Sequence, residues 1–274
     1  MRTLRFDLIP DAGSFTPLQL KPTFILSSCF NANERWSRAY GVPHQVAVRD
    51  LQTAFVIHVA RVHYQERHTY QDAENLSVEV TRRALKEGTQ VEARCIYESQ
   101  PGHTVAEASL CIVPLSLVGE GGELAGLPAP MPFSYLETFE ASERFAEGYP
   151  SPFPSARQQI EKNGEPLASF QHPFFLHRTH CEFVDQWFFI EAANFAEASR
   201  ERMVFEQGAK MPLLRRGLSL PVREVNLLFS RPFYLFDEGR VHTRAYKLPE
   251  GVVFIHDLTK SDPSESHATV IERF

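Results

Sequence analysis

The sequence predicts an α+β protein made of two tandem units, each a long helix followed by an antiparallel sheet. The first observation is an internal repeat: when Tyr64 is placed on Phe229, Asp72 falls on Asp237 without a gap. The second is the strict alternation of apolar and polar residues in the segments that follow each helical stretch, which is typical of strands. A repeat this long indicates two matched domains rather than a solenoid, whose units are far shorter.

The first unit is predicted to cover residues 1–118. A short strand near Leu4–Ile9 opens it, and apolar residues then recur on one face of a helix over residues 23–40, which Gly41 ends. Four strand-like segments follow, at 52–65, 75–84, 89–99 and 104–117. Because the apolar face of an uncovered sheet would remain exposed to water, we expect the helix to pack across this sheet.

Residues 119–171 are rich in glycine and proline and are predicted to be a connector, with one short helix near Tyr135–Phe145. The second unit is predicted over residues 172–274. It is expected to contain a strand from Phe174 through Cys181 and a helix from Gln186 to Gln207. Its further strands are expected near 219–230, 239–247, 251–259 and 267–273.

Length, charge and composition exclude several classes of protein. A chain of 274 residues can bury one core in each of two domains. A net charge of −6 argues against nucleic acid as a partner, since phosphate contacts need a basic face. No apolar run approaches the length of a membrane span, and the N-terminus lacks the features of a secretory signal. The four cysteines show no paired spacing, so we expect reduced thiols and a cytoplasmic protein.

Known short motifs narrow the chemistry further. The glycines do not continue into a phosphate-binding loop, and no Gly-x-Ser-x-Gly elbow of a serine hydrolase is present. His177 and His180 would fall on opposite faces of a strand, which argues against a shared metal site. We therefore expect no metal and no cofactor.

Several segments share a pattern with one known family. They are Ala32–Gly41, Ala60–Tyr64, Leu76–Thr81, Gly88–Arg94 and Val105–Ser109 in the first copy, and Glu197–Arg200 and Phe229–Phe233 in the second. A long helix wrapped by a sheet, in two linked copies with these segments in this order, resembles the double hotdog fold of acyl-ACP thioesterases and of the wider hydroxybenzoyl-CoA thioesterase group. The resemblance covers most of the chain.

The resemblance implies an acyl thioester hydrolase that acts on an acyl-ACP or acyl-CoA in fatty-acid or polyketide-type metabolism. It also implies that the two units pair within one chain, with further homodimerisation open. Two alternatives stay open: an acyltransferase or dehydratase on the same scaffold, and a catalytically silent module that binds acyl chains.

The first catalytic candidate is Asp185. The family carries Asp-x-Asn-x-His before its second helix, and the matching positions here are Phe183, Asp185 and Trp187. Thioester hydrolysis needs a carboxylate to activate water and donors for the oxyanion, which a helix N-terminus supplies. If Asp185 lies where the second helix begins, it is either that carboxylate or an N-cap, or both.

Three further ionisable residues are candidates. Glu191 interrupts an apolar Trp-Phe-Phe-Ile run and is either a functional carboxylate or a solvent-facing one. His180 is either a base partner for Asp185 or a structural residue. Asp11 lies in Pro-Asp-Ala-Gly, in a loop where single-hotdog thioesterases often carry Asp, and it is otherwise a turn-forming residue.

Aromatic residues dominate the start of the predicted second helix and are candidates for acyl binding. An aromatic stripe of this kind either lines a pocket for an acyl chain or belongs to the core. The candidates are Trp187, Phe188, Phe189 and Phe195.

Overall fold

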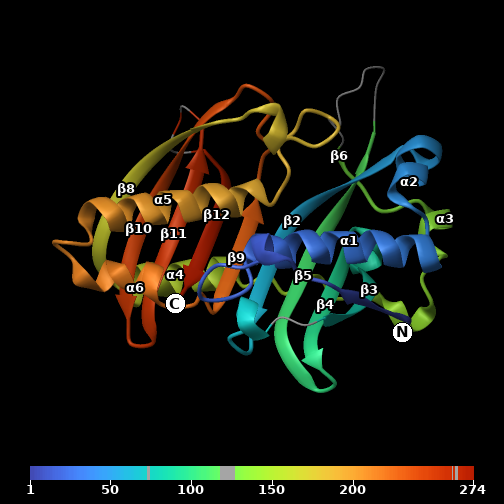
Figure 1. The fold of residues 1–274 in the computed structure, drawn as a ribbon. Helices are drawn as coiled ribbons and strands as arrows, with labels where there is room; N and C mark the ends of the chain where they lie inside the picture. Colours follow the sequence, from blue (N-terminus) through green and yellow to red (C-terminus); the bar gives the residue numbers. More distant parts are fainter. Residues whose placement is uncertain (73–74, 118–126, 261, 263–264) are drawn as a thin grey trace. The chain divides into compact units, whose positions relative to one another are not determined.

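The chain folds into two units, each with one long helix on one sheet (Figure 1). The computed structural model describes residues 1–72, 75–117, 127–260, 262 and 265–274. Unit 1 consists of Met1–Phe15 and Phe24–Pro150, and unit 2 of Thr16–Thr23 and Ser151–Phe274. The stretch expected to be a connector is thus divided: its described part up to Pro150 belongs to unit 1, and the part from Ser151 belongs to unit 2.

Unit 1 contains the expected long helix and antiparallel sheet. Helix α1 (Pro22–Tyr40) ends at Gly41, whose N–H donates to the carbonyl of Ser37 at 2.9 Å. The main sheet has the order β1 (Thr3–Leu8), β3 (Leu76–Leu85), β4 (Gln90–Gln100), β5 (His103–Ser116) and β2 (Thr53–Tyr64). Shorter elements are η1 (Ala12–Ser14), α2 (His44–Leu51), η2 (Tyr70–Asp72), η3 (Lys86–Gly88) and β6 (Leu127–Pro128). The predicted helix and strands of this unit are confirmed to within about two residues at each end.

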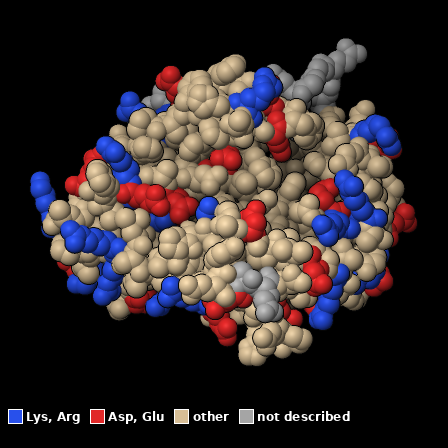
Figure 2. Space-filling view, in the orientation of Figure 1, with Lys and Arg blue, Asp and Glu red and all other residues tan. Residues whose placement is uncertain are grey.

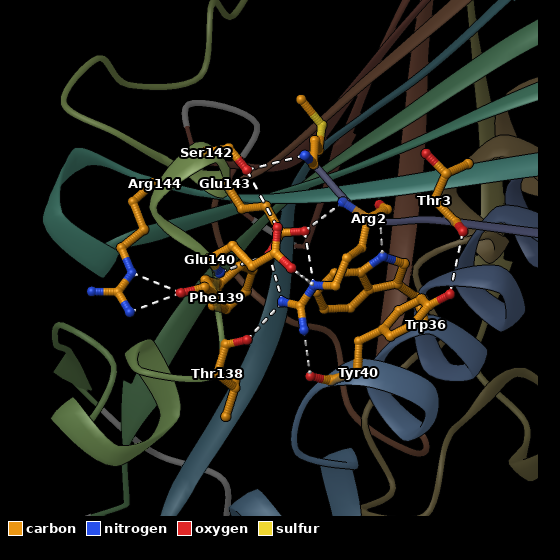
Figure 3. A network of polar contacts seen from close by, with 11 residues as sticks. Arg2, Thr3, Trp36, Tyr40, Thr138, Phe139, Glu140, Ser142, Glu143 and Arg144 are labelled. Carbon is orange, nitrogen blue, oxygen red and sulfur yellow. Dashed lines mark hydrogen bonds and ion pairs between the residues drawn. The ribbon is translucent and has the colours of Figure 1, made fainter.

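The remainder of unit 1 holds short elements where one short helix was predicted. They are α3 (Phe133–Leu136), η4 (Ala141–Glu143) and β7 (Arg144–Phe145), and β7 pairs in parallel with the end of β3. A ring of polar contacts ties this segment to the first residues of the chain (Figure 3). Arg2 is its centre: its guanidinium lies over the ring of Trp36 and donates to the carboxylate of Glu143, which is fully buried.

Glu143 also accepts from two backbone N–H groups, those of Arg2 at 2.7 Å and Glu140 at 2.9 Å. Burial alone would raise the pKa of Glu143, but the hydrogen bonds from Arg2 and from Glu140 lower it.

Replacing Glu143 by Gln should destabilise unit 1 by about 2 kcal/mol. The amide N–H groups of Gln would then point at the N–H donors of Arg2 and Glu140, which need an acceptor. Urea unfolding followed by circular dichroism would measure this. Glu140→Gln is the matched control, because Glu140 is half exposed and lies 3.6 Å from Arg2, so a loss equal to that of Glu143→Gln would contradict the prediction.

Unit 2 repeats the same arrangement in the same order. Helix α4 (Phe153–Asn163) leads into a sheet with the order β8 (Glu165–Phe175), β10 (Glu238–Leu248), β11 (Gly251–Thr259), β12 (Ser266–Arg273) and β9 (Glu224–Phe229). The long helix is α5 (Glu191–Gln207), which lies across β10, β11 and β12 (Figure 1). Short helical segments are η5 (Arg178–His180), η6 (Pro212–Arg215) and α6 (Arg216–Ser219).

Four predicted boundaries in unit 2 are wrong. The first strand covers Glu165–Phe175 rather than Phe174–Cys181, and the strand expected at 219–230 begins at Glu224. The long helix begins at Glu191 rather than at Gln186. The cause is backbone pairing with another segment: Gln186 forms a bridge with Tyr234, and the N–H of Trp187 donates to the carbonyl of Phe233 at 3.0 Å. These backbone groups are therefore not available for helical hydrogen bonds.

The internal repeat is confirmed in structural detail. Tyr64 is the last residue of β2 and Phe229 the last residue of β9, and these two strands hold equivalent places in their sheets. Asp72 accepts a hydrogen bond from the N–H of Thr69 at 2.9 Å. The matching Asp237 accepts from the N–H of the residue three before it, Tyr234, at 2.7 Å. The gapless sequence match therefore covers the same side-chain-supported turn in both units.

A buried polar chain runs through unit 2, from α5 across three strands. Arg200 donates to Glu272 at 2.5 Å, and the second oxygen of that carboxylate lies 3.1 Å from Nε2 of His256. The chain continues from Nδ1 of His256 to Thr243 at 2.8 Å and on to Ser199 at 2.7 Å. Burial would raise the pKa of Glu272, but Arg200 and His256 hold it at about 2. Because Ser199, Thr243 and His256 are fully buried, this serine, histidine and carboxylate cannot meet a substrate and serve the fold.

Two further sequence-based expectations concern the whole described chain. Each of the four cysteines is free, and three of them are buried. Among the residues that the structure describes, no helix combines the length and apolar character of a membrane span.

Candidate functional site

The segment that precedes α5 is a bridged turn, and it carries the first catalytic candidate. Cys181 pairs with Trp187 across this turn, and the N–H of Asp185 donates to the carbonyl of Glu182 at 3.1 Å. Asp185 adopts a positive φ of 56°, a conformation in which Asp is more common than most residues. Asp185 thus lies before the helix rather than at its start, and the predicted N-cap role is wrong because the chain pairs with another segment first.

The side chain of Asp185 forms an ion pair with Arg178. Their closest atoms are 2.6 Å apart, and the two side chains are 48% and 72% exposed. A pair so accessible to water contributes little to folding. It does fix the carboxylate on the outer side of the turn.

Glu191, the second candidate, is the first residue of α5. It accepts a hydrogen bond from Nδ2 of Asn194 at 3.0 Å. The N–H groups of Glu191, Ala192 and Ala193 already donate to carbonyls of the turn before the helix, at 2.9, 3.3 and 3.0 Å. The oxyanion donors expected from this helix N-terminus are therefore already engaged.

His180 and Asp11 have local partners of their own. Nδ1 of His180 accepts from the N–H of His177 at 3.1 Å, and the imidazole ring packs edge-on against Phe195. Asp11 belongs to unit 1, where its carboxylate accepts from the N–H of Ser14 at 3.0 Å and from its hydroxyl at 2.8 Å. These hydrogen bonds lower the pKa of Asp11 and support η1, as a turn-forming residue does.

Glu182 is the ionisable residue of this turn that the sequence reasoning missed. Burial raises the pKa of its carboxyl to about 7, far above the usual value for Glu. Burial also raises the pKa of the neighbouring Cys181 thiol, and Asp185, Glu182 and Glu191 raise it further. The charges of Glu182 and Asp185 from the turn and of Glu191 from α5 thus all act on the Cys181 thiol, while that of Arg178 opposes them. The sequence signal of Glu182 is weak: a Glu between Cys181 and the apolar pair Phe183 and Val184.

The aromatic candidates divide into two groups. Trp187 and Phe189 are buried, and both pack edge-on against Phe229 at the end of β9. Phe195 lies on α5 and stacks on Phe174 of β8 with ring centroids 4.4 Å apart. Of the four candidates only Phe195 is helical, because Trp187, Phe188 and Phe189 belong to the turn before α5.

Comparison with known proteins gives a likeness of structure but not of sequence. No protein-family model matches the sequence, and no curated protein sequence matches it. A provisionally assigned oleoyl thioesterase from Lactobacillus plantarum superposes with a TM-score of 0.74 at 9% identity, over 99% of this chain and 94% of that one.

Two further solved structures agree. The 12:0-ACP thioesterase from Umbellularia californica gives a TM-score of 0.69 at 7% identity, over 99% of this chain and 96% of the other. An acyl-ACP thioesterase from Bacteroides thetaiotaomicron gives 0.65 at 11% identity, over 98% and 96% of the two chains. The chain has the double hotdog fold. The predicted fold class is confirmed.

The double hotdog scaffold carries mixed charge here. On the face drawn in Figure 2, Lys and Arg are interspersed with Asp and Glu. Within the described ranges, no group of three or more His, Cys, Asp or Glu side chains is placed to hold a metal ion.

One cavity of this double hotdog protein lies in unit 1, and none of the residues named so far as catalytic or acyl-binding candidates lines it. The predicted candidates other than Asp11 lie instead in the turn before α5 and on α5 itself. The structure thus separates one polar cavity in unit 1 from one carboxylate-rich turn in unit 2.

Proposed function

We propose that this chain hydrolyses an acyl thioester and that Glu182 is the carboxylate that activates water. The observation that carries the reaction class is the fold, and Glu182 is chosen within it because it is the half-buried carboxyl of the turn before α5, where burial raises its pKa to about 7. A general base is most effective when its pKa lies near the working pH. The reaction class is supported by the fold, which this chain shares over almost its full length with proteins named as thioesterases.

The proposed step balances with water as the co-reactant. The carboxylate of Glu182 takes a proton from water as the oxygen attacks the thioester carbonyl and the C–O bond forms. The tetrahedral intermediate then expels the thiolate as the C–S bond breaks, and Glu182 returns the proton to sulfur. The products are a free acid and a free thiol, and the carboxylate is regenerated.

Other residues of the turn have supporting roles in this proposal. The ion pair with Arg178 lies at the surface of the turn, and Asp185 and Glu191 are the alternative carboxylates for the same step. Phe188 and Phe195 are half-buried and are proposed to contact the acyl chain, while Trp187 and Phe189 support them from the core. The proposed substrate carrier is an acyl carrier protein or CoA, in a cytoplasmic setting consistent with four free cysteines.

A panel of acyl thioesters on both carriers tests this function. We expect release of free thiol, detected with a chromogenic thiol reagent, together with equimolar free acid by mass spectrometry. Acyl transfer or a dehydrated product without thiol release would contradict hydrolysis. Tight binding of the same thioesters without turnover would contradict it as well and would identify a binding module.

A further inference from the structure

The segment that follows α5 in unit 2, residues 208–223, is basic, although the whole chain carries a net charge of −6. It contains no Asp or Glu, and it includes η6 and α6. Figure 2 shows Lys and Arg side chains gathered over this end of unit 2, at the lower left. We call residues 208–223 the basic segment. Its cations, all of them exposed, are Lys210, Arg215, Arg216 and Arg223.

The cations of the basic segment have no acidic partner among the residues that the structure describes. Nε of Arg215 donates to the carbonyl of Gly208 at 3.1 Å, and this is a neutral acceptor. Other exposed cations of unit 2 do form ion pairs, as Arg231 does with Glu265 and Lys247 with Glu165. The positive charge of the basic segment is therefore not compensated by the protein itself.

The acidic residues that flank the basic segment are engaged elsewhere. Glu206, in the last turn of α5, pairs with Arg202 at 2.6 Å. Glu224, the first residue of β9, lies 3.4 Å from Nε of Arg273. An anionic partner that approaches the basic segment would thus meet cations whose charge these carboxylates do not cancel.

The basic segment also exposes large apolar side chains. Met211, Leu218 and Leu220 are between 37% and 44% exposed, and Phe205 in the last turn of α5 is 78% exposed. Single exposed apolar residues are ordinary, but apolar residues that alternate with unpaired cations along one segment form a surface of mixed character. Such a surface suits a partner that is both anionic and apolar.

The inner side of the basic segment holds it against the core. Leu214 and Val222 are buried, and Gly217 lies so close to Phe254 of β11 that an added Cβ would be 2.8 Å from the ring. The exposed cations and apolar side chains are therefore presented by a backbone that is packed on the sheet, which lowers the entropy lost on binding.

Three kinds of partner fit this surface less well than a lipid surface does. A second copy in a two-fold dimer would place the same cations against each other, which is unfavourable. A single-stranded nucleic acid would need aromatic side chains for base stacking, and the basic segment contains none. An acidic protein would need apolar groups at matching positions between its carboxylates. An anionic bilayer offers charged headgroups directly above an apolar layer, whatever the exact spacing.

We propose that the basic segment docks unit 2 on an anionic lipid surface. The four cations contact the headgroups, and Met211, Leu218 and Leu220 insert between them. Clusters of four or more Lys and Arg residues on an amphipathic element are typical of binding to anionic lipids. The chain then lies on the membrane rather than spanning it. This inference goes beyond the proposed function and does not depend on it.

Sedimentation of the intact protein with lipid vesicles tests the proposal. One set of vesicles is phosphatidylcholine alone, and the other contains about 30% phosphatidylglycerol, which supplies the negative surface potential. We expect binding to the anionic vesicles to be at least about tenfold tighter at roughly 0.1 M salt, and to weaken by about tenfold or more at roughly 0.5 M salt through screening.

Two double variants assign the binding to the basic segment. Lys210→Gln with Arg216→Gln should weaken binding to anionic vesicles by about tenfold or more. Both side chains are exposed, so folding is not at risk. Leu218→Ser with Leu220→Ser should weaken it by about fivefold and leave its salt dependence in place.

The matched control is Arg231→Gln with Lys247→Gln. It changes the net charge by the same amount, but at exposed cations of unit 2 that have acidic partners. We expect a loss of about twofold or less in this control. A loss equal to that of the Lys210 and Arg216 variant would overturn the proposal, because net charge alone would then explain the binding.

No binding to anionic vesicles, or equal binding to both kinds, would also overturn the proposal. Binding of labelled poly-glutamate without binding to anionic vesicles would overturn it and would assign the basic segment to an acidic protein. Because the vesicles contain no thioester, these results are independent of the thioester panel. Thioester hydrolysis without vesicle binding would leave the proposed function standing and remove this inference, and vesicle binding without hydrolysis would do the reverse.

Discussion

Replacing Glu182 by Gln is expected to lower thioester turnover by about a hundredfold or more, the scale of losing a general base. Gln keeps the size of the side chain but cannot take a proton from water. Steady-state release of free thiol by the variant and the parent protein, at saturating thioester and pH 8, measures the loss. An unchanged rate would remove Glu182 from the reaction.

The raised pKa of Glu182 predicts that activity increases with pH, whereas folding stability decreases. Its pKa of about 7 means that turnover should rise between pH 6 and pH 8, as the base becomes ionised. Its pKa in the unfolded chain is about 4.5, so the folded state favours the protonated form. The stability from this group is thus fully present below pH 4.5 and is lost as the pH rises through 7.

Glu182→Gln should therefore be more stable than the parent protein at pH 8, by up to about 3 kcal/mol, and equally stable at pH 4.5. Urea unfolding at the two pH values checks this. If Glu182 is catalytic and burying its carboxylate costs folding stability, the variant should gain stability and lose turnover together. A purely structural role predicts a loss of stability instead.

Asp185→Asn is the matched control from the same turn. It removes a carboxylate that lies three residues after Glu182, is half exposed and is paired with Arg178. We expect less than a fivefold change in turnover. A hundredfold loss in this variant, with Glu182→Gln unaffected, would transfer the catalytic role to Asp185.

Glu272→Gln is expected to destabilise unit 2 by about 3 kcal/mol, because it leaves the buried guanidinium of Arg200 with only the partly exposed carboxylate of Glu197 as counter-charge. Both side chains are almost fully buried, so water cannot replace the lost partner. Since the folded state lowers the pKa of Glu272 to about 2, its contribution is present above pH 4.5 and is lost as the pH falls through 2. Chemical unfolding at pH 7 gives the loss directly.

Two comparisons test the cause of that loss. Glu206→Gln breaks the exposed pair with Arg202 on the same helix and should change stability by less than about 0.5 kcal/mol. Joint replacement of Arg200 by Met and Glu272 by Leu removes both charges and should recover much of the stability. If the double variant is as unstable as Glu272→Gln, the missing counter-charge of Arg200 is not the reason for the lost stability.

The outline of the fold followed from the sequence because it depends on local signals. Period-2 alternation placed the strands, and Gly41 and Gly208 placed the ends of the two long helices. The repeat that joins Tyr64 to Phe229 predicted two matched units, and both positions end equivalent strands. Each of these features is determined by neighbours within a few residues, where propensity and burial act together.

The candidate site was decided by tertiary structure. The apolar run from Trp187 to Ile190 fits a helix by composition, yet its backbone pairs with Phe233 and Tyr234 more than forty residues away. That pairing moves Asp185 off the helix start. The burial that raises the pKa of Glu182 is likewise a property of the folded chain and not of its local sequence.

The sequence by itself thus determined where the long helix and the strands of unit 1 lie, where both long helices end and that the unit occurs twice, because periodicity and glycine stops are local. Only the tertiary structure decided which carboxylate is shielded from water and which polar residues of α1, α2 and β3 meet at one cavity. Burial and side-chain contacts depend on segments distant in sequence. No pattern along the chain can therefore specify them.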